Sequence, residues 1–229
     1  MIPLLEKGQT IEQEVSTVIY YIAVPLVWLF SHICFRIQVI GKENLPKKGG
    51  YILAPNHVSG FDPVIILPVS RWLPKLVTFA KKELFEINFF LTWLFKQLGG
   101  MAVRGGGKDE VDIMAQTIAK CKAGHGLLIF PEGTRSKDGK LGSPKSGAFV
   151  VAAAAGVDMV PCRILYDTPD GRCHWFCRVK VVFGQPIPAA QLDLGEKRDM
   201  KKLRENKKLL VQRWEQLYEE NKYPERGNA

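Results

Sequence analysis

A histidine and an aspartate, His57 and Asp62, lie five residues apart in the segment NHVSGFD. The pKa of an imidazole is near neutrality, so a histidine can remove a proton from a hydroxyl group as its oxygen attacks a carbonyl carbon. The other ring nitrogen must then be held, usually by a carboxylate that fixes the tautomer and stabilises the imidazolium. Because Gly60 allows a short turn, we predict that Asp62 contacts the His57 ring. The spacing alone also fits a plainer interpretation, with Asp62 as a helix cap and His57 as an ordinary loop residue.

A second polar segment, FPEGTRS at residues 130–136, brings a carboxylate, a hydroxyl and a guanidinium within four residues of one another. Its glycine permits a ligand to approach the backbone closely, and a guanidinium is suited to bidentate binding of phosphate. Taken singly, each charge fits an ordinary surface residue or a structural ion pair as well as it fits a ligand-binding residue. Together they predict a pocket for a phosphate and a polyol beside the base His57. The candidate residues for this pocket, including two cations from other segments, are Arg104, Glu132, Gly133, Thr134, Arg135 and Lys145.

The hydrophobic pattern predicts the elements that carry these residues. Runs rich in β-branched and aromatic residues predict strands. Apolar residues at helical spacing, together with capping residues, predict helices that alternate with the strands. This alternation indicates an α/β fold, with a mostly parallel central sheet flanked by helices. The predicted strands are 36–40, 51–54, 76–79, 101–103, 127–130, 159–165 and 179–184, and the predicted helices are 62–72, 109–122, 146–155 and a C-terminal helix from Asp199.

Three polar sequences directly follow predicted strands: NHVSGFD, Arg104 and PEGTRS. In open α/β sheets, ligands bind beyond the carboxyl ends of the strands. We therefore expect these three sequences, which are far apart in the chain, to meet at one edge of the sheet. At the start of the helix that follows NHVSGFD, we expect Asp62 as the N-cap and Pro63 as the first helical residue.

Two hydrophobic segments predict contact with a membrane. One is the apolar run 17–34, and the other is the aromatic run FFLTWLF within residues 83–97. A bilayer span needs about 20 apolar residues, so the first run is of marginal length, and Pro25 lies within it. We expect a helix that lies in the membrane interface, with a single span as the first alternative and a helix packed on a soluble core as the second. A basic n-region and a small-residue cleavage site, which mark a signal peptide, are both absent.

The distribution of charge favours an anionic surface as a partner. The 229-residue chain has a formal net charge of +9, and residues 71–108 carry seven Lys and Arg against two Glu. Cations beside an aromatic run suit an anionic membrane. Nucleic acid is not expected as a partner, because zinc-finger, RRM and helix-turn-helix signatures are absent and the aromatic residues are not interleaved with basic ones. The five cysteines contain no CxxC pair, and no metal site is predicted.

With these segments in view, the chain resembles the glycerolipid acyltransferase family typified by bacterial 1-acyl-sn-glycerol-3-phosphate acyltransferase. The resemblance covers roughly residues 35–190. It departs from the family pattern at Val103, where an aromatic or acidic residue is usual, and at Cys162, where valine or isoleucine is usual. The segments that carry it, in family order, are NHVSGFD (56–62), GGMAVRG (99–105), FPEGTRS (130–136) and MVPCRI (159–164).

The resemblance implies direct acyl transfer without an acyl-enzyme. His57 would deprotonate the sn-2 hydroxyl of lysophosphatidate, Asp62 would orient His57, and the oxygen would attack the thioester of acyl-CoA or acyl-carrier protein to give phosphatidate. Glu132 and Arg135 are implied to bind the glycerol phosphate and Arg104 the phosphate, while Gly133 and Thr134 shape the pocket. No metal or bound cofactor is implied, since acyl-CoA or acyl-carrier protein is a co-substrate.

The expected organisation is a membrane-associating helical segment over residues 1–34 and an acyltransferase domain over residues 35–229. The expected location is the cytoplasmic face of the cell membrane, as a peripheral or monotopic protein. The nearest alternative is the same chemistry on glycerol 3-phosphate or another lysophospholipid. Hydrolysis by water at His57 and a non-catalytic basic membrane-binding protein are the remaining ones.

Overall fold

The computed structural model describes residues 10–68, 76–81, 100–103, 108–136 and 138–224. The strands are β1 (Arg36–Ile40), β2 (Tyr51–Pro55), β3 (Leu76–Lys81), β4 (Gly100–Val103), β5 (Gly126–Leu128), β6 (Asp158–Tyr166) and β7 (Arg178–Phe183). The helices are α1 (Thr10–Cys34), α2 (Asp62–Ile66), α4 (Lys108–Lys122), α5 (Gly147–Ala155), α6 (Ala189–Leu192), α7 (Met200–Asn221) and the short 3-10 helix η1 (Lys42–Asn44).

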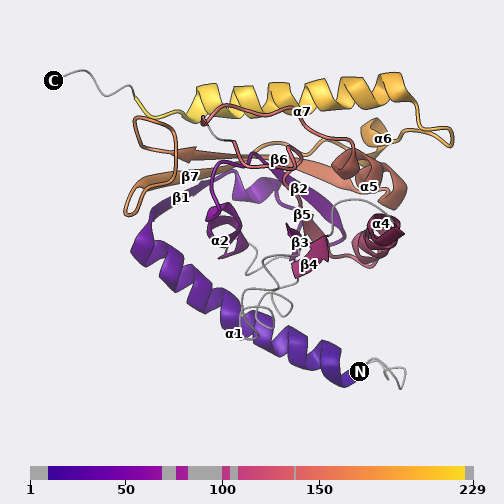
Figure 1. The fold of residues 1–229 in the computed structure, drawn as a ribbon, viewed down its shortest axis with the longest axis horizontal. Coiled ribbons are helices and arrows are strands. Elements are labelled where there is room, and N and C mark those ends of the chain that lie inside the picture. Colours follow the sequence, from indigo (N-terminus) through magenta and orange to yellow (C-terminus); the bar gives the residue numbers. More distant parts are fainter. Residues whose placement is uncertain (1–9, 69–75, 82–99, 104–107, 137, 225–229) are drawn as a thin grey trace.

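The strands form one sheet in the order β1-β7-β6-β2-β5-β3-β4. Every neighbouring pair is parallel except β6 and β7, which are antiparallel. Helices α1 and α2 lie on one side of the sheet, and α7 runs along the other side (Figure 1). The predicted α/β fold with a mostly parallel, helix-flanked sheet is therefore confirmed.

Strand β2 lies in the middle of the sheet and all five of its residues are buried. Side chains alternate across a strand, so Leu53 packs into the core with α2 while Ile52 and Ala54 pack into the core with α5 and α7. The buried Trp214 of α7 donates its indole N–H to the Ala54 carbonyl oxygen over 2.9 Å. This hydrogen bond fixes the end of β2, from which the polar segment NHVSGFD begins.

The start of α2 differs from the prediction. Phe61 is the N-cap and Asp62 is the first helical residue, because the Asp62 side chain turns back onto the preceding loop instead of capping the helix. The described part of the helix ends at Ile66, and residues 69–72, over which the helix was predicted to continue, lie outside the described residues. The short helices η1 and α6 were not predicted.

Helix α1 confirms the helical prediction for the N-terminal segment over residues 10–34. Ala23 and Val24 on one side of it pack against Leu67, next to α2. The most exposed large apolar side chains of α1 lie on another side, and they are those of Ile22, Leu26, Leu29, Phe30 and Ile33; Trp28 is exposed to a lesser extent. Among the described residues, no helix has the length and apolar character needed to cross a membrane. The aromatic run within residues 83–97 lies outside the described residues.

Candidate active site

The loop between β2 and α2 brings His57 and Asp62 into contact. The Nδ1 atom of His57 lies 2.8 Å from Oδ2 of Asp62. The same carboxylate oxygen accepts the backbone N–H groups of Val58 at 2.7 Å and Ser59 at 2.8 Å. The Asp62 side chain is 0% exposed, so these donors replace the water that would otherwise solvate its charge. A carboxylate at Nδ1 places the ring proton there and leaves Nε2 as an acceptor.

The second oxygen of Asp62 is held by a residue that the sequence analysis missed. The hydroxyl of Tyr166, the last residue of β6, donates to Asp62 Oδ1 over 2.5 Å. Burial first, and then the charge of Asp62, raise the pKa of Tyr166 well above its usual value, so the phenol stays protonated and remains a donor. Its position directly after the predicted strand 159–165 was an available signal, because that strand ends at the same edge of the sheet as β2.

The segment FPEGTRS forms hydrogen bonds with both the N–H and the carbonyl oxygen of His57. The His57 N–H donates to Glu132 Oε1 at 2.9 Å, and the Ser136 N–H donates to the His57 carbonyl oxygen at 2.8 Å. The Phe130 ring stacks on the imidazole, with ring centroids 3.9 Å apart. The His57 side chain is 17% exposed, and no described residue forms a hydrogen bond with its Nε2. The two segments therefore meet at one edge of the sheet, as predicted for the neighbouring strands β2 and β5.

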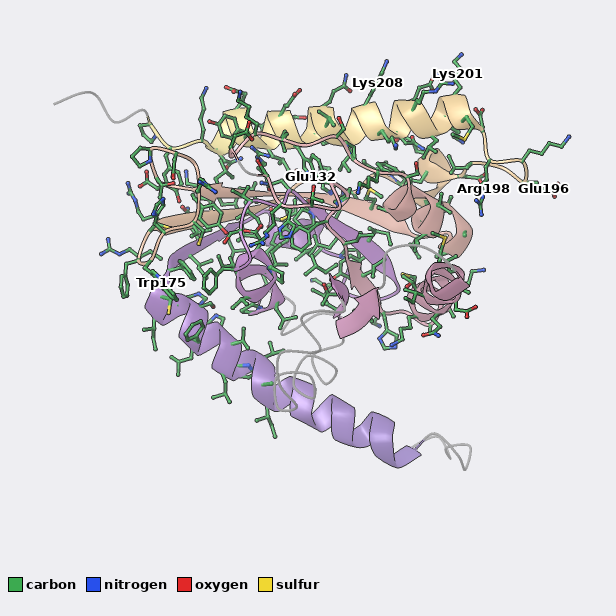
Figure 2. The ribbon with its side chains drawn as sticks, in the orientation of Figure 1. Glu132, Trp175, Glu196, Arg198, Lys201 and Lys208 are labelled. Atoms are coloured by element: carbon green, nitrogen blue, oxygen red, sulfur yellow. The ribbon has the colours of Figure 1, made fainter. Side chains whose placement is uncertain are left out.

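Glu132 lies between α7 and α1 in the view of Figure 2 and is buried, whereas the three residues that follow it are exposed. It is 5% exposed, and its Oε2 accepts the Gly142 N–H over 3.0 Å while Oε1 accepts that of His57. Burial raises the pKa of Glu132, and the two N–H donors and the nearby cation of Arg163 act in the opposite direction. Both oxygens thus already accept protein N–H groups. This geometry differs from the implied role of Glu132 as a direct ligand of glycerol phosphate.

The next three residues, Gly133, Thr134 and Arg135, are exposed at the same edge. Gly133 has a φ of +72°, and a Cβ atom placed on it would lie 2.8 Å from Lys145 Nζ. The Lys145 ammonium therefore lies against the Gly133 backbone, and the Lys145 N–H donates to the Pro131 carbonyl oxygen. The structure thus brings Lys145 to the backbone of Gly133.

Arg104 lies outside the described residues. Strand β4, which leads to it, is the edge strand of the sheet, and β3 separates it from β5. Because β4 is parallel to β3, and β3 to β5, the carboxyl end of β4 lies at the same edge of the sheet as the ends of β2 and β5.

A pocket of about 250 Å³ opens beside the loop that carries His57. Residues 58–60 and Arg135 line one side, and the loop between β6 and β7 lines the other with residues 170 and 172–174. The Arg135 side chain lies close to Gly60, since a Cβ atom placed on Gly60 would be 3.3 Å from Arg135 Nη1. Two arginines, Arg135 and Arg172, thus line one pocket. Arg172 was not predicted, because nothing in its local sequence indicates which part of the sheet the loop faces.

The loop between β6 and β7 has internal hydrogen bonds that position Arg172. The Thr168 hydroxyl donates to the Arg172 carbonyl oxygen at 2.7 Å, and the Arg172 N–H donates to Asp170 Oδ1 at 3.1 Å. His174 Nε2 lies 3.0 Å from Asp170 Oδ2. This contact, followed by the Arg172 N–H, lowers the pKa of Asp170 to about 2. Asp170 is therefore a charged carboxylate that also lines the pocket, and it is hydrogen-bonded within its own loop beside Arg135 and Arg172.

The buried side chain of Asn56 joins the start of the His57 loop to β6. Its Oδ1 accepts the Ile164 N–H at 2.7 Å, and its Nδ2 donates to the Ile164 carbonyl oxygen at 3.4 Å. The two bonds continue the pairing of β2 with β6 beyond Pro55, where the β2 backbone leaves the sheet. Asn56 thus sets the direction in which the chain reaches His57.

Comparison with known proteins places this geometry in context. The model of the family described as Acyltransferase matches residues 36–165. The curated "1-acyl-sn-glycerol-3-phosphate acyltransferase LPAT1, chloroplastic" of Arabidopsis thaliana is 31% identical over 168 residues, which are 70% of this chain and 46% of that protein. The 1-acyl-sn-glycerol-3-phosphate acyltransferase of Bacillus subtilis is 32% identical over 157 residues, 67% of this chain and 75% of that protein. The chain spans about half the length of the first curated relatives that it matches.

Among solved structures, the chain resembles the crystal structure of the 1-acyl-sn-glycerophosphate (LPA) acyltransferase, PlsC, from Thermotoga maritima. The TM-score is 0.65 at 24% sequence identity, with 89% of this chain and 83% of that chain covered. At this identity, the likeness extends to the fold.

Proposed function

This chain belongs to the Acyltransferase family, and from that premise we propose that it transfers an acyl group from a thioester to the sn-2 hydroxyl of 1-acyl-sn-glycerol 3-phosphate, forming phosphatidate. The observation that carries the proposal is the contact of His57 with the buried Asp62 beside a pocket lined by two arginines. A base held in one tautomer and a cationic pocket next to it are what this acceptor requires.

In the proposed reaction, Nε2 of His57 accepts the proton of the sn-2 hydroxyl as its oxygen attacks the thioester carbonyl carbon. The carbon–sulfur bond of the resulting tetrahedral intermediate then breaks, and the imidazolium returns the proton to the leaving thiolate. Asp62 stabilises the imidazolium through Nδ1–H and keeps the ring oriented. Tyr166 and the N–H groups of Val58 and Ser59 hold Asp62 and so act through it as positioning groups.

Acyl transfer proceeds directly to the acceptor in this proposal. The sequence lacks the Gly-x-Ser-x-Gly elbow of serine acyl-enzymes. Cys173 lines the pocket, but burial raises the pKa of its thiol, which disfavours the nucleophilic thiolate. The residue positioned for chemistry is therefore the base His57, and acyl-CoA or acyl-carrier protein serves as a co-substrate.

The phosphate of the acceptor is proposed to bind between Arg135 and Arg172, with Lys145 and Arg104 as further cations. Guanidinium groups bind phosphate oxygens through paired N–H donors, and two of them suit a phosphate monoester with close to two negative charges. This favours lysophosphatidate over lysophospholipids with zwitterionic head groups. Glu132 is proposed as a positioning residue, because it bridges the loop of His57 to Gly142.

The exposed side of α1 is proposed to lie in the membrane interface at the cytoplasmic face of the cell membrane. Five of its exposed apolar residues follow the spacing i, i+4, i+7, i+8 and i+11 from Ile22 to Ile33, which places them in one stripe, while the less exposed Trp28 lies outside it. A helix on the surface of a water-soluble protein turns a polar face outward, whereas an interfacial helix turns such a stripe to lipid. A lipid acceptor would then be within the same surface as the enzyme.

The proposed function is tested with the full chain, vesicles and a radiolabelled acyl thioester, either acyl-CoA or acyl-carrier protein. The acceptor panel contains lysophosphatidate, glycerol 3-phosphate, lysophosphatidylethanolamine and water, and the lipid products are separated. We expect phosphatidate from lysophosphatidate, and we expect His57→Ala to lower its rate by about 10³-fold while vesicle binding is kept. His125→Ala serves as a matched control, since His125 precedes β5 at the opposite edge of the sheet. Transfer by His57→Ala near the wild-type rate would falsify the assignment of the base, and release of free fatty acid alone would identify a hydrolase.

A further inference from the structure

Two aromatic side chains at the tip of the loop between β6 and β7 are largely exposed. Trp175 is 57% exposed and Phe176 is 67% exposed. Trp175 lies beside the carboxyl end of α1 (Figure 2). The Phe176 N–H donates to the Cys34 carbonyl oxygen at 2.8 Å, and the Arg36 N–H donates to the Cys177 carbonyl oxygen at 3.1 Å. The tip is thus fastened to the chain where α1 passes into β1.

The indole of Trp175 is held in place by two rings of the core. It stacks on the buried Phe35, with ring centroids 5.9 Å apart and planes 6° from parallel, and it makes an edge contact with Phe61 at 5.1 Å. These contacts cover one part of the indole and leave the rest outside. The exposed aromatic surface therefore has a fixed position relative to α1.

Phe176 adopts a backbone conformation that is unfavourable for its side chain. Its φ is +61°, in the left-handed region that bulky residues rarely occupy. The conformation turns an exposed phenyl group away from the protein, and no apolar core of the described residues includes that group. Strain kept at an exposed apolar residue points to a role outside the fold itself.

We infer that Trp175 and Phe176 form a second membrane contact, which inserts into the surface of an anionic phospholipid bilayer next to α1. The last exposed apolar residue of α1 is Ile33, which is next to Cys34 in the chain. The Cys34 carbonyl oxygen accepts the Phe176 N–H, so the exposed apolar residues of the helix and of the tip make one continuous surface. Indole and phenyl groups partition into the boundary between head groups and acyl chains. The exposed cations Arg36 and Arg172 flank the tip and complement anionic head groups.

This contact sets where the pocket stands relative to the bilayer. Residues 172–174 line the pocket and directly precede the two aromatic residues. Insertion of the tip would therefore bring the mouth of the pocket to the level of the head groups. In this respect the inference rests on the proposed function, because an acceptor with one acyl chain could then place its phosphate in the pocket while its chain stays in lipid.

The test compares Phe176→Asn with Met200→Asn on vesicles of phosphatidylcholine and phosphatidylglycerol. Asparagine removes the apolar ring and tolerates the left-handed conformation, so Phe176→Asn should be at least as resistant to heat as the wild type. We expect its partition coefficient to fall by about tenfold. Met200 is 59% exposed at the start of α7, and its substitution should leave partitioning unchanged. Phe176→Leu should keep most of the binding, because its side chain is still apolar.

Equal partitioning of Phe176→Asn and Met200→Asn would overturn the inference. A change of oligomeric state in sedimentation, with vesicle binding unchanged, would overturn it as well and would assign the tip to a contact between protein chains. A short-chain, water-soluble lysophosphatidate should be acylated by Phe176→Asn at the wild-type rate. If the wild type acylates neither the short-chain lysophosphatidate nor lysophosphatidate in vesicles, the proposed function fails. The comparison of vesicle partitioning still decides the role of the tip.

Discussion

The hydroxyl of Tyr166 donates to the one oxygen of Asp62 that His57 does not contact. Asp62 therefore has a donor from β6 as well as donors from its own loop, and its carboxylate is fixed from two separate elements. A buried carboxylate with fewer donors would lose part of the compensation for its desolvation. Tyr166 thus joins the loop of His57 to the centre of the sheet.

Tyr166→Phe removes this donor and keeps the ring. We expect the free energy of unfolding to fall by about 1–3 kcal/mol, since Asp62 Oδ1 is left buried without a partner. We expect kcat to fall by about tenfold with KM for both substrates unchanged, because the substitution acts on the orientation of His57. Steady-state kinetics and urea unfolding measure the two effects, with Tyr218→Phe on α7 as the control. A higher acceptor KM at unchanged kcat would assign Tyr166 to ligand binding instead.

Glu132→Gln tests the bridge between His57 and Gly142. The amide oxygen can accept one of the two N–H groups, whereas the amide nitrogen faces the other N–H without forming a bond. We expect kcat to fall by about tenfold, with a smaller change in acceptor KM. If Glu132 binds the acceptor directly, the acceptor KM should rise and kcat should hold.

The stability effect of Glu132→Gln should depend on pH. Burial raises the pKa of Glu132 in the folded chain, so its ionisation is less favourable there than in the unfolded chain. Its contribution to the free energy of unfolding is therefore present below its ordinary pKa and is lost as the pH rises through the raised, folded value. The stability difference between wild type and variant should be larger at about pH 4 than at about pH 7. A difference that grows with pH in urea titrations would contradict this sign.

Arg135→Ala and Arg172→Ala test the two sides of the pocket. Each is expected to lower kcat/KM for lysophosphatidate by about 10- to 100-fold, the effect of losing charge-assisted hydrogen bonds. The change should lie mainly in the acceptor KM, and the KM for acyl-CoA should hold. Arg204→Ala, an exposed cation of α7, is the control. An equal effect on the acyl-CoA KM would reassign the pocket to the phosphate monoester of the donor, and acyl-carrier protein, which lacks that group, would separate the two sources.

Gly133→Ala tests the close approach of Lys145. An added Cβ meets Lys145 Nζ at 2.8 Å, and the φ of +72° is unfavourable for alanine. We expect a loss of about 1–2 kcal/mol in the free energy of unfolding and a higher acceptor KM, as the ammonium is displaced. Gly147→Ala is a matched control, because it begins α5 with open space around its Cβ position and should be neutral or stabilising. Equal effects of the two substitutions would contradict the packing argument.

The sequence predicted the elements better than the side-chain contacts. Strand 36–40 was predicted with the bounds that the structure has, and NHVSGFD and FPEGTRS meet because they follow neighbouring strands. Hydrophobic periodicity is a local signal, so it carries this information. The contact of His57 with Asp62 was also predicted, while the catalytic role of the pair stays a prediction.

The contacts that could not be predicted depend on the packing of distant segments. Tyr166 and Arg172 are more than 100 residues from His57, and only the sheet order and the β6–β7 loop bring them near it. The inward position of Glu132 follows from the N–H groups of two other loops. Asp62 likewise accepts the N–H groups of Val58 and Ser59 in its own loop rather than capping α2. Spacing within one segment contains none of this information.

The place of β1 in the sheet has a consequence for the order of events during synthesis. Strand β1 pairs with no described strand other than β7, which begins about 140 residues later in the chain. When a ribosome delivers the chain from its amino end, α1 and β1 emerge long before the strand that secures them. If α1 lies in the membrane interface as proposed, its apolar side meets the bilayer while the loop of His57 still lacks its neighbours. Targeting to the membrane would precede maturation of the site, so that the enzyme completes its folding at the surface where it works.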